Sequence, residues 1–148
     1  MDKIDFSDKY FMQQAYKEAR EAFSKNEVPV GAIIVSQGQI IARAHNLTET
    51  LNDVTAHAEM LAITSAAVNL GGKYLNNCTL YITLEPCTMC AGALSWAQIK
   101  RIVIGASDQQ RGFTRLQPSP LHPKTEITTG IMAEECSELV KEFFKNKR

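Results

Sequence analysis

Two short segments of the chain carry residues that can bind a metal ion. His57 lies in the first segment, and Cys87 and Cys90 lie in the second, three positions apart. Residues three apart share one face of a helix, so both sulfurs can point at one ion, and a neutral histidine nitrogen can add a third ligand. Three protein ligands leave the fourth position of a tetrahedral zinc ion free for water, which is typical of a catalytic site. The spacing therefore predicts a catalytic Zn²⁺ held by His57, Cys87 and Cys90.

Glu59 is the predicted proton carrier of this site. It lies two positions after His57, close enough to reach water at the metal without being forced to bind the metal itself. Zinc makes water acidic enough to lose a proton near neutral pH, and a neighbouring carboxylate can accept that proton and pass it on. These residue types together indicate a zinc-dependent hydrolytic reaction with Glu59 as general acid and base.

A single Cys-x-x-Cys pair also occurs outside catalytic zinc sites. It could be a redox pair, half of a structural zinc site, or a chance occurrence. The sequence contains no second pair and no following His-x-x-x-His, which argues against a zinc finger, and a thioredoxin-like pair would not account for His57 and Glu59. The remaining cysteines and histidines have no partner at ligand spacing: Cys78, Cys136, His45 and His122.

Hydrophobic periodicity and turn residues predict the elements that position these side chains. A first helix is expected to begin after Ser7, a favourable N-cap, and to end at Asn26 and Pro29. Both metal-binding segments then fall at the start of a helix, where free backbone N–H groups and the helix dipole lower thiol pKa values. The other predicted elements are strands at 30–35 and 40–44 around a turn at 37–38, a helix from 56 to before 71, a strand at 79–84, a helix at 86–98, a strand at 101–105, a proline-containing loop at 107–124, a short strand at 126–129 and an amphipathic helix at 131–144.

Composition is that of an ordinary globular protein. The 148 residues are 45% hydrophobic and 22% charged, and they predict one domain over residues 1–148 with a sheet covered by helices on both faces. Sixteen basic residues balance sixteen acidic ones, so binding of a nucleic acid would need a local basic patch. The first residues contain no apolar run and no stretch is long enough to span a membrane, so we expect a cytoplasmic protein.

The motifs resemble those of the cytidine and deoxycytidylate deaminase superfamily, whose zinc site has the pattern H-x-E…P-C-x-x-C. Within it, the chain resembles the bacterial tRNA adenosine deaminases, which convert a wobble adenosine to inosine. The similarity runs from about residue 10 to 148 and is carried by residues 28–32, Asn46, and residues 55–59, 84–93, 101–106 and 126–144.

This resemblance implies a three-layer α/β/α fold with a five-stranded mixed sheet. It also implies a homodimer in which the partner subunit contributes residues to the substrate cleft. It also implies that Asn46 contacts the ribose or base of the target nucleotide, although an asparagine could equally cap a loop. Val30 would line the base pocket, or it could belong to the core. The resemblance thus predicts zinc-dependent deamination of a tRNA adenosine.

The chain departs from that branch at residues 95–99 and 108–113. Trp96 and Ala97 are closer to bacterial guanine deaminases, so a metabolic deaminase of a free base or nucleoside, such as guanine or cytosine, is the alternative. A further alternative is a non-catalytic binding protein stabilised by zinc. Glu59 argues against it, because a structural zinc ion has no use for that carboxylate. Trp96 itself is expected in the core or in a dimer interface.

Local contacts to RNA are predicted for Arg111, Phe113 and Lys145. Arg111 lies in the proline-containing loop and Lys145 near the end of the last helix, where basic residues could contact phosphates. Phe113 could stack on a base that has left its helix. The alternative is that the lysines form a solvated face and that Phe113 packs under its loop.

Overall fold

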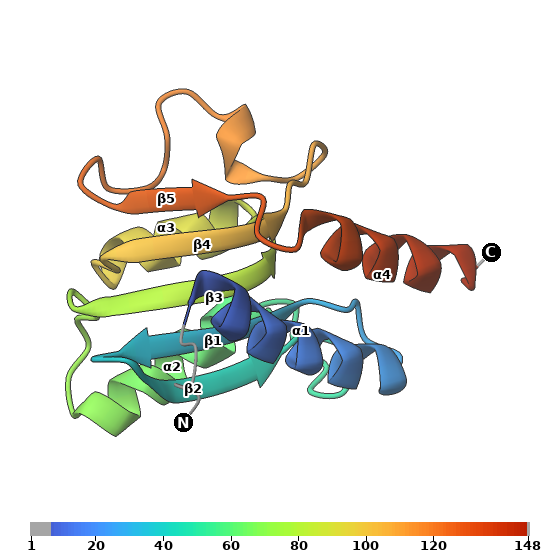
Figure 1. The fold of residues 1–148 in the computed structure, drawn as a ribbon, viewed down its shortest axis with the longest axis horizontal. Helices are drawn as coiled ribbons and strands as arrows, with labels where there is room; N and C mark the ends of the chain where they lie inside the picture. Colours follow the sequence, from blue (N-terminus) through green and yellow to red (C-terminus); the bar gives the residue numbers. More distant parts are fainter. Residues whose placement is uncertain (1–6, 148) are drawn as a thin grey trace, which may run out of the picture.

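A computed structural model describes residues 7–147 as one five-stranded mixed sheet between two pairs of helices (Figure 1). Sheet order is β2-β1-β3-β4-β5, with β1 antiparallel to both neighbours and β3, β4 and β5 parallel. The elements are α1 (Asp8–Ser24), β1 (Gly31–Ser36), β2 (Gln39–His45), α2 (Ala58–Leu70), β3 (Cys78–Leu84), α3 (Thr88–Trp96), β4 (Arg101–Ala106), the 3₁₀ helix η1 (Phe113–Arg115), β5 (Glu126–Thr129) and α4 (Ala133–Lys145). The predicted fold class and all predicted helices and strands are confirmed.

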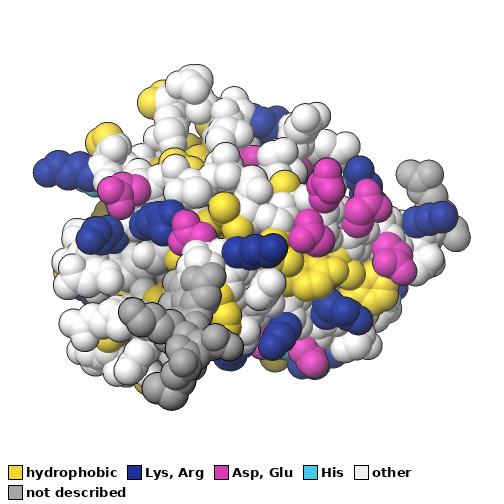
Figure 2. Space-filling view, in the orientation of Figure 1, with side chains coloured by type: hydrophobic (Ala, Val, Ile, Leu, Met, Phe, Trp, Pro, Cys, Tyr) yellow, Lys and Arg dark blue, Asp and Glu magenta, His cyan; other side chains and the backbone are white. Residues whose placement is uncertain are grey.

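Helices α1 and α4 cover one face of the sheet. The Ser7 side chain caps α1 by accepting a hydrogen bond from the Tyr10 N–H. Buried side chains of α1, among them Phe11 and Met12, pack against β1, β3 and β4. The approach is close, because a Cβ on Gly31 would lie 2.1 Å from the Ala15 carbonyl oxygen. On the outer side, basic and acidic side chains are interspersed around an apolar strip between the two helices (Figure 2). The electrostatic potential of this face is therefore not dominated by one sign of charge.

Helices α2 and α3 cover the opposite face. Three buried alanines of α2, Ala58, Ala62 and Ala66, lie against the isoleucine- and leucine-rich strands of the larger core cluster. Ala91 and Leu94 of α3 join the same cluster. Small side chains let the helices approach the sheet closely, and their N-termini meet at one edge, beyond the carboxyl ends of β3 and β4 (Figure 1). Ligands of α/β proteins commonly bind at that edge.

Two differences from the sequence-based prediction lie near this edge. Helix α3 begins at Thr88, with Cys87 as its N-cap, and not at Pro86. The segment stays extended because the Pro86 carbonyl accepts the Phe113 N–H at 3.0 Å and Cys87 forms a β-bridge with Gly112. The same pairing gives the 107–124 loop a short helix, η1, where only irregular chain was predicted. Along residues 7–147, no helix has the length and hydropathy needed to cross a bilayer.

Candidate metal centre and substrate cavity

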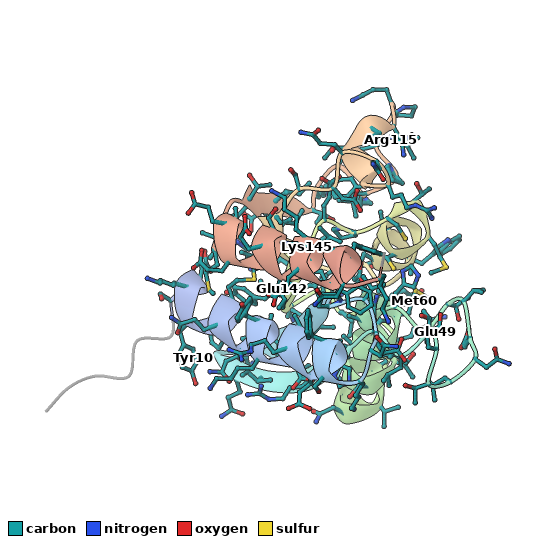
Figure 3. All side chains as sticks on the ribbon, turned by 90° about the vertical axis from the view of Figure 1, so that its right-hand side faces the viewer. Tyr10, Glu49, Met60, Arg115, Glu142 and Lys145 are labelled. Carbon is teal, nitrogen blue, oxygen red and sulfur yellow. The ribbon has the colours of Figure 1, made fainter. Side chains whose placement is uncertain are left out.

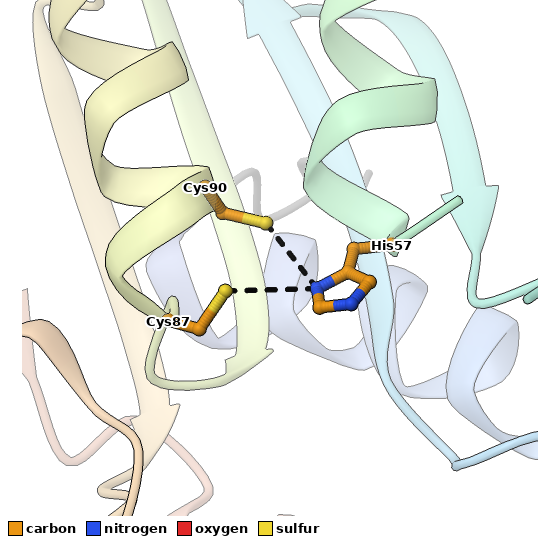
Figure 4. A group of neighbouring side chains, drawn as sticks. All are labelled: His57, Cys87 and Cys90. Atoms are coloured by element: carbon orange, nitrogen blue, oxygen red, sulfur yellow. Dashed lines mark hydrogen bonds between the residues drawn. The ribbon is translucent and has the colours of Figure 1, made fainter. Parts of the chain in front are cut away.

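Three metal donors meet at the N-termini of α2 and α3 (Figure 4). His57 Nδ1 lies 3.7 Å from Cys87 Sγ and 3.5 Å from Cys90 Sγ, and all three donor atoms lie within 4.8 Å of one another. Tetrahedral zinc with ordinary Zn–N and Zn–S bonds would separate such a nitrogen and sulfur by about 3.6 Å. One histidine and two cysteines therefore fit zinc in both chemistry and spacing.

Backbone geometry aims the three side chains at this point. His57 and Cys87 are the N-caps of α2 and α3, and Cys90 follows one turn later. Neither N-cap side chain forms a capping hydrogen bond, which leaves the imidazole and the thiol available as ligands. Asn46 supplies the missing cap of α2, because its Oδ1 accepts the Ala58 N–H at 2.8 Å. Asn46 thereby fixes the start of the helix that carries His57.

The three donor side chains shift one another's pKa values. Hydrogen bonding to Cys90, opposed by burial, lowers the pKa of Cys87 to about 3. The neighbouring Cys87 sulfur and burial raise the pKa of Cys90 well above its ordinary value, and the hydrogen bond to Cys87 raises the pKa of His57. A divalent cation needs both thiolates and a neutral imidazole. Protons therefore compete with the metal for Cys90 and His57.

Glu59 lies in the first turn of α2, directly beside the donors. Its side chain is only 4% exposed, and this burial raises the pKa of Glu59 to about 7. A carboxyl group with a pKa near neutrality can both accept and return a proton at physiological pH. The position and the pKa suit the predicted acid–base role.

A cavity of about 710 Å³ opens from this site toward solvent. His57, Glu59 and Cys87 line it together with Asn46 and Val30. Figure 3 views the molecule from the edge where the site lies. In this view, Lys145 on α4, Glu49 in the loop before α2 and Arg115 in η1 lie well apart from one another. The further lining residues come from five segments: Val28, Thr48, Leu84–Glu85, Ala106–Arg111, and Ser137, Val140, Lys141 and Phe144 of α4.

The structure brings most of the sequence-predicted substrate residues to this cavity. Val30 lines the cavity and also belongs to the core cluster, and its contact with a base stays a prediction. Asn46 likewise lines the cavity and caps a backbone N–H. Arg111 is exposed on the wall. Lys145 is exposed but does not line the cavity, whereas Lys141 of the same helix does.

Two aromatic residues differ from their predicted environments. Phe113 is 2% exposed and packs into the core cluster, so the prediction that it stacks on a base is wrong and the alternative, packing under its loop, holds. Trp96 is 85% exposed, so it is not a core residue. The last turn of α3 directs it away from the sheet, which periodicity in a short, largely apolar helix did not reveal.

Two buried glutamates near the cavity were missed. Glu27 is fully buried and accepts hydrogen bonds from the Glu49 N–H, and from the N–H and hydroxyl of Thr50. It thereby holds the loop that leads to His57. Glu85 is 6% exposed and makes comparable bonds to the loop after β4. Each lies next to a recognisable motif, but no spacing rule marks an isolated acidic residue as buried.

Comparison with known proteins supports the assignment of the site. Residues 6–106 match the model of the cytidine and deoxycytidylate deaminase zinc-binding region. A tRNA-specific adenosine deaminase of Aquifex aeolicus is 48% identical over 144 residues, which is 94% of this chain and 95% of the relative. A chain from a structural study of A-to-I editing by tRNA:A34 deaminases at the wobble position of transfer RNA is 43% identical, with a TM-score of 0.83 over 88% of this chain and 98% of that one.

Guanine deaminase from Bacillus subtilis is also similar, but over less of the chain. It is 42% identical with a TM-score of 0.64, and the match covers 66% of this chain and 63% of the guanine deaminase chain. The matches to the zinc-binding region and to relatives along nearly the full length agree with the three donors found at the edge of the sheet. This protein belongs to the cytidine and deoxycytidylate deaminase family of zinc-binding proteins.

Proposed function

We propose that this protein is a tRNA adenosine deaminase that converts a wobble adenosine to inosine. The observation that carries the substrate assignment is the 48% identity to such an enzyme over 94% of the chain. The similarity to guanine deaminase extends over only 66% of it. One domain over residues 1–148 would carry the whole activity, and a tRNA substrate leads us to expect a cytoplasmic location.

The residues of the cavity provide the parts that hydrolytic deamination needs. A zinc ion held by His57, Cys87 and Cys90 supplies Lewis acidity that makes water a nucleophile near neutral pH. Glu59 accepts one proton from the attacking water and delivers it to the ring nitrogen; it then takes the second proton from the hydroxyl group that the water has become and delivers it to the amino group, which leaves as ammonia. The water oxygen remains on the purine carbon, so adenosine becomes inosine.

Asn46 and Val30 would hold the base at this reaction centre. The Asn46 Oδ1 is used by the Ala58 N–H, and its amide nitrogen makes no hydrogen bond to any residue in 7–147, so it can donate to the ribose or base. Val30 presents an apolar side chain to the ring, as the walls of base-binding cavities often do. Both roles follow from the family resemblance.

The experiment that tests the function uses an anticodon stem-loop of an arginine tRNA with adenosine at the wobble position. We expect inosine in the product, detected as a mass increase of about one dalton. Free guanine, cytosine and adenosine serve as parallel substrates. Efficient turnover of free guanine without inosine in the stem-loop would assign the protein to the metabolic deaminases instead.

Basic residues around the cavity are expected to supply the phosphate contacts, since the net charge of the chain is zero. Arg111→Ala, Lys141→Ala and Lys145→Ala should each weaken stem-loop binding and reduce the slope of log affinity against log salt by about one unit for each lost phosphate contact. Lys73→Ala is the matched control, because Lys73 follows the far end of α2. If all four variants weakened stem-loop binding equally, or if no variant weakened it, the result would argue against a local RNA contact at the cavity.

We also propose that the protein is a homodimer that uses the outer surface of α2 and α3. Two large apolar side chains are exposed there, Val68 at 78% and Trp96 at 85%, and Val54 in the loop before α2 is 84% exposed. Exposed aromatic and aliphatic side chains on one layer are typical of protein–protein interfaces. The family resemblance adds that the partner contributes to the substrate cleft.

A charged residue in this surface is expected to separate the subunits. Trp96→Glu should shift micromolar protein from dimer to monomer in sedimentation experiments, because the carboxylate would be desolvated in the interface. If the partner subunit contributes residues to the cleft, stem-loop turnover should fall in proportion to the fraction of dimer. Leu116→Glu, at an exposed apolar position outside α2 and α3, should remain dimeric. A monomeric wild-type protein at these concentrations would contradict the dimer.

A further inference from the structure

Glu85 is a buried carboxylate that borders the cavity without belonging to the metal donors. It follows β3 directly and is 6% exposed. Its Oε1 accepts the Asp108 N–H at 3.1 Å, while its Oε2 accepts the Thr114 N–H at 3.0 Å and the Thr114 hydroxyl at 2.8 Å. One side chain therefore holds both ends of the 107–114 loop, which follows β4.

The 107–114 loop is folded closely around this carboxylate. A Cβ on Gly112 would lie 2.0 Å from Glu85 Oε2, so only glycine leaves room for the oxygen. The Gly112 N–H donates to the Asp108 carbonyl at 2.9 Å, and Asp108 Oδ1 accepts the Arg111 N–H at 3.0 Å. Backbone, glycine and carboxylate together define one conformation of the loop.

This loop forms a wall of the substrate cavity. Asp108, Gln109, Gln110 and Arg111 line the same cavity as His57 and Glu59. Within residues 7–147, Glu85 makes no hydrogen bond to the zinc donors or to Glu59. The carboxylate thus bears on the position of the wall and not on the proton-transfer group.

We infer that Glu85 is a positioning residue that fixes the 107–114 loop as the substrate-binding wall of the deaminase. A carboxylate is required because three N–H and O–H donors converge on its two oxygens, whereas an amide has one acceptor oxygen and would turn an NH₂ group toward a donor. The kinetic part of this inference rests on the proposed function, since it needs a substrate that reaches the wall.

The test combines kinetics with hydrogen exchange on the zinc-loaded protein. Glu85→Gln should raise KM for the anticodon stem-loop about tenfold, the scale of losing a hydrogen bond to a charged group, while kcat changes less than about threefold. Deuterium uptake should increase in peptides over 107–114 and stay unchanged in α2 and β3. Zinc content should remain at the wild-type value, since no ligand is altered.

Thr114→Val provides a second variant that keeps the carboxylate and removes only one of its bonds. It should change KM and exchange in the same direction but less, and combining it with Glu85→Gln should add little. Thr125→Val is the matched control, because the Thr125 hydroxyl donates to the Ile99 carbonyl outside the cavity. If Glu85→Gln unfolds or loses zinc, Thr114→Val alone decides.

Unchanged exchange over 107–114 in both Glu85→Gln and Thr114→Val would overturn the inference, as would an effect on kcat alone. Failure of the proposed function can be distinguished from failure of the inference about Glu85. If the wild-type protein acts on free guanine and not on the stem-loop, the exchange experiment still tests the role of Glu85, and the KM measurement is made with guanine.

Discussion

Glu59→Ala is expected to reduce kcat by about 10⁴-fold or more while the protein keeps its fold and its zinc. A single general acid–base group typically contributes about 10²–10⁴-fold, and Glu59 is proposed to transfer protons at several steps of the same turnover. It is buried beside the three donors but is not one of them. The measurements are single-turnover inosine formation and zinc content of the same preparation.

Glu59→Gln is the control for shape, because it keeps the volume of the side chain but cannot exchange a carboxyl proton. It should be as inactive as Glu59→Ala. In the wild-type protein, kcat/KM should fall as the pH is lowered through the pKa of Glu59, which burial raises to about 7, because a protonated carboxyl group cannot accept a proton from water. Near-normal activity of either variant would exclude the mechanism, and loss of zinc would make Glu59 a ligand.

Removal of both cysteine ligands is expected to abolish zinc binding and activity together. The wild-type chain should contain about one zinc ion, whereas Cys87→Ala/Cys90→Ala should contain almost none, because a lone histidine binds zinc weakly. Elemental analysis and stem-loop turnover measure the two effects. Cys136→Ala is the matched control, since Cys136 is a buried cysteine of α4 that lies outside the cluster, and it should keep its zinc.

The pH dependence of zinc binding provides a second measurement. Zinc binding must displace protons from Cys90, whose pKa is raised by Cys87 and burial, and from His57, whose pKa is raised by its hydrogen bond to Cys87. Protons therefore compete with the metal, and zinc affinity should fall as the pH falls. A double variant that retains full zinc, or a wild-type affinity that does not depend on pH, would contradict the assigned ligands.

The sequence by itself determined the features that depend on local spacing. Cys87 and Cys90 are three positions apart at the start of a helix, and His57 precedes another helix, so residue types and spacing were enough to predict a metal cluster. The α/β fold with helices on both faces was also predictable, because the strands and helices have distinct hydrophobic periods and clear turn residues between them.

Tertiary structure alone decided which side chains face the cavity. Phe113 could by its sequence either stack on a base or pack under its loop, and the fold buries it in the core at η1. Trp96 is exposed although its helix is largely apolar. These outcomes depend on how a loop or a helix end docks on the sheet, which has no short-range signature in the sequence.

The same reason applies to the polar residues that support the site. Asn46 caps a helix that begins 12 residues later, and Glu85 bonds the Asp108 N–H 23 residues away. Only the folded chain brings such groups together, because the sheet places the end of β2 beside the start of α2 and the end of β3 beside the loop after β4. Local spacing thus determined the metal chemistry, whereas the long-range contacts of the fold decided the shape of the cavity around it.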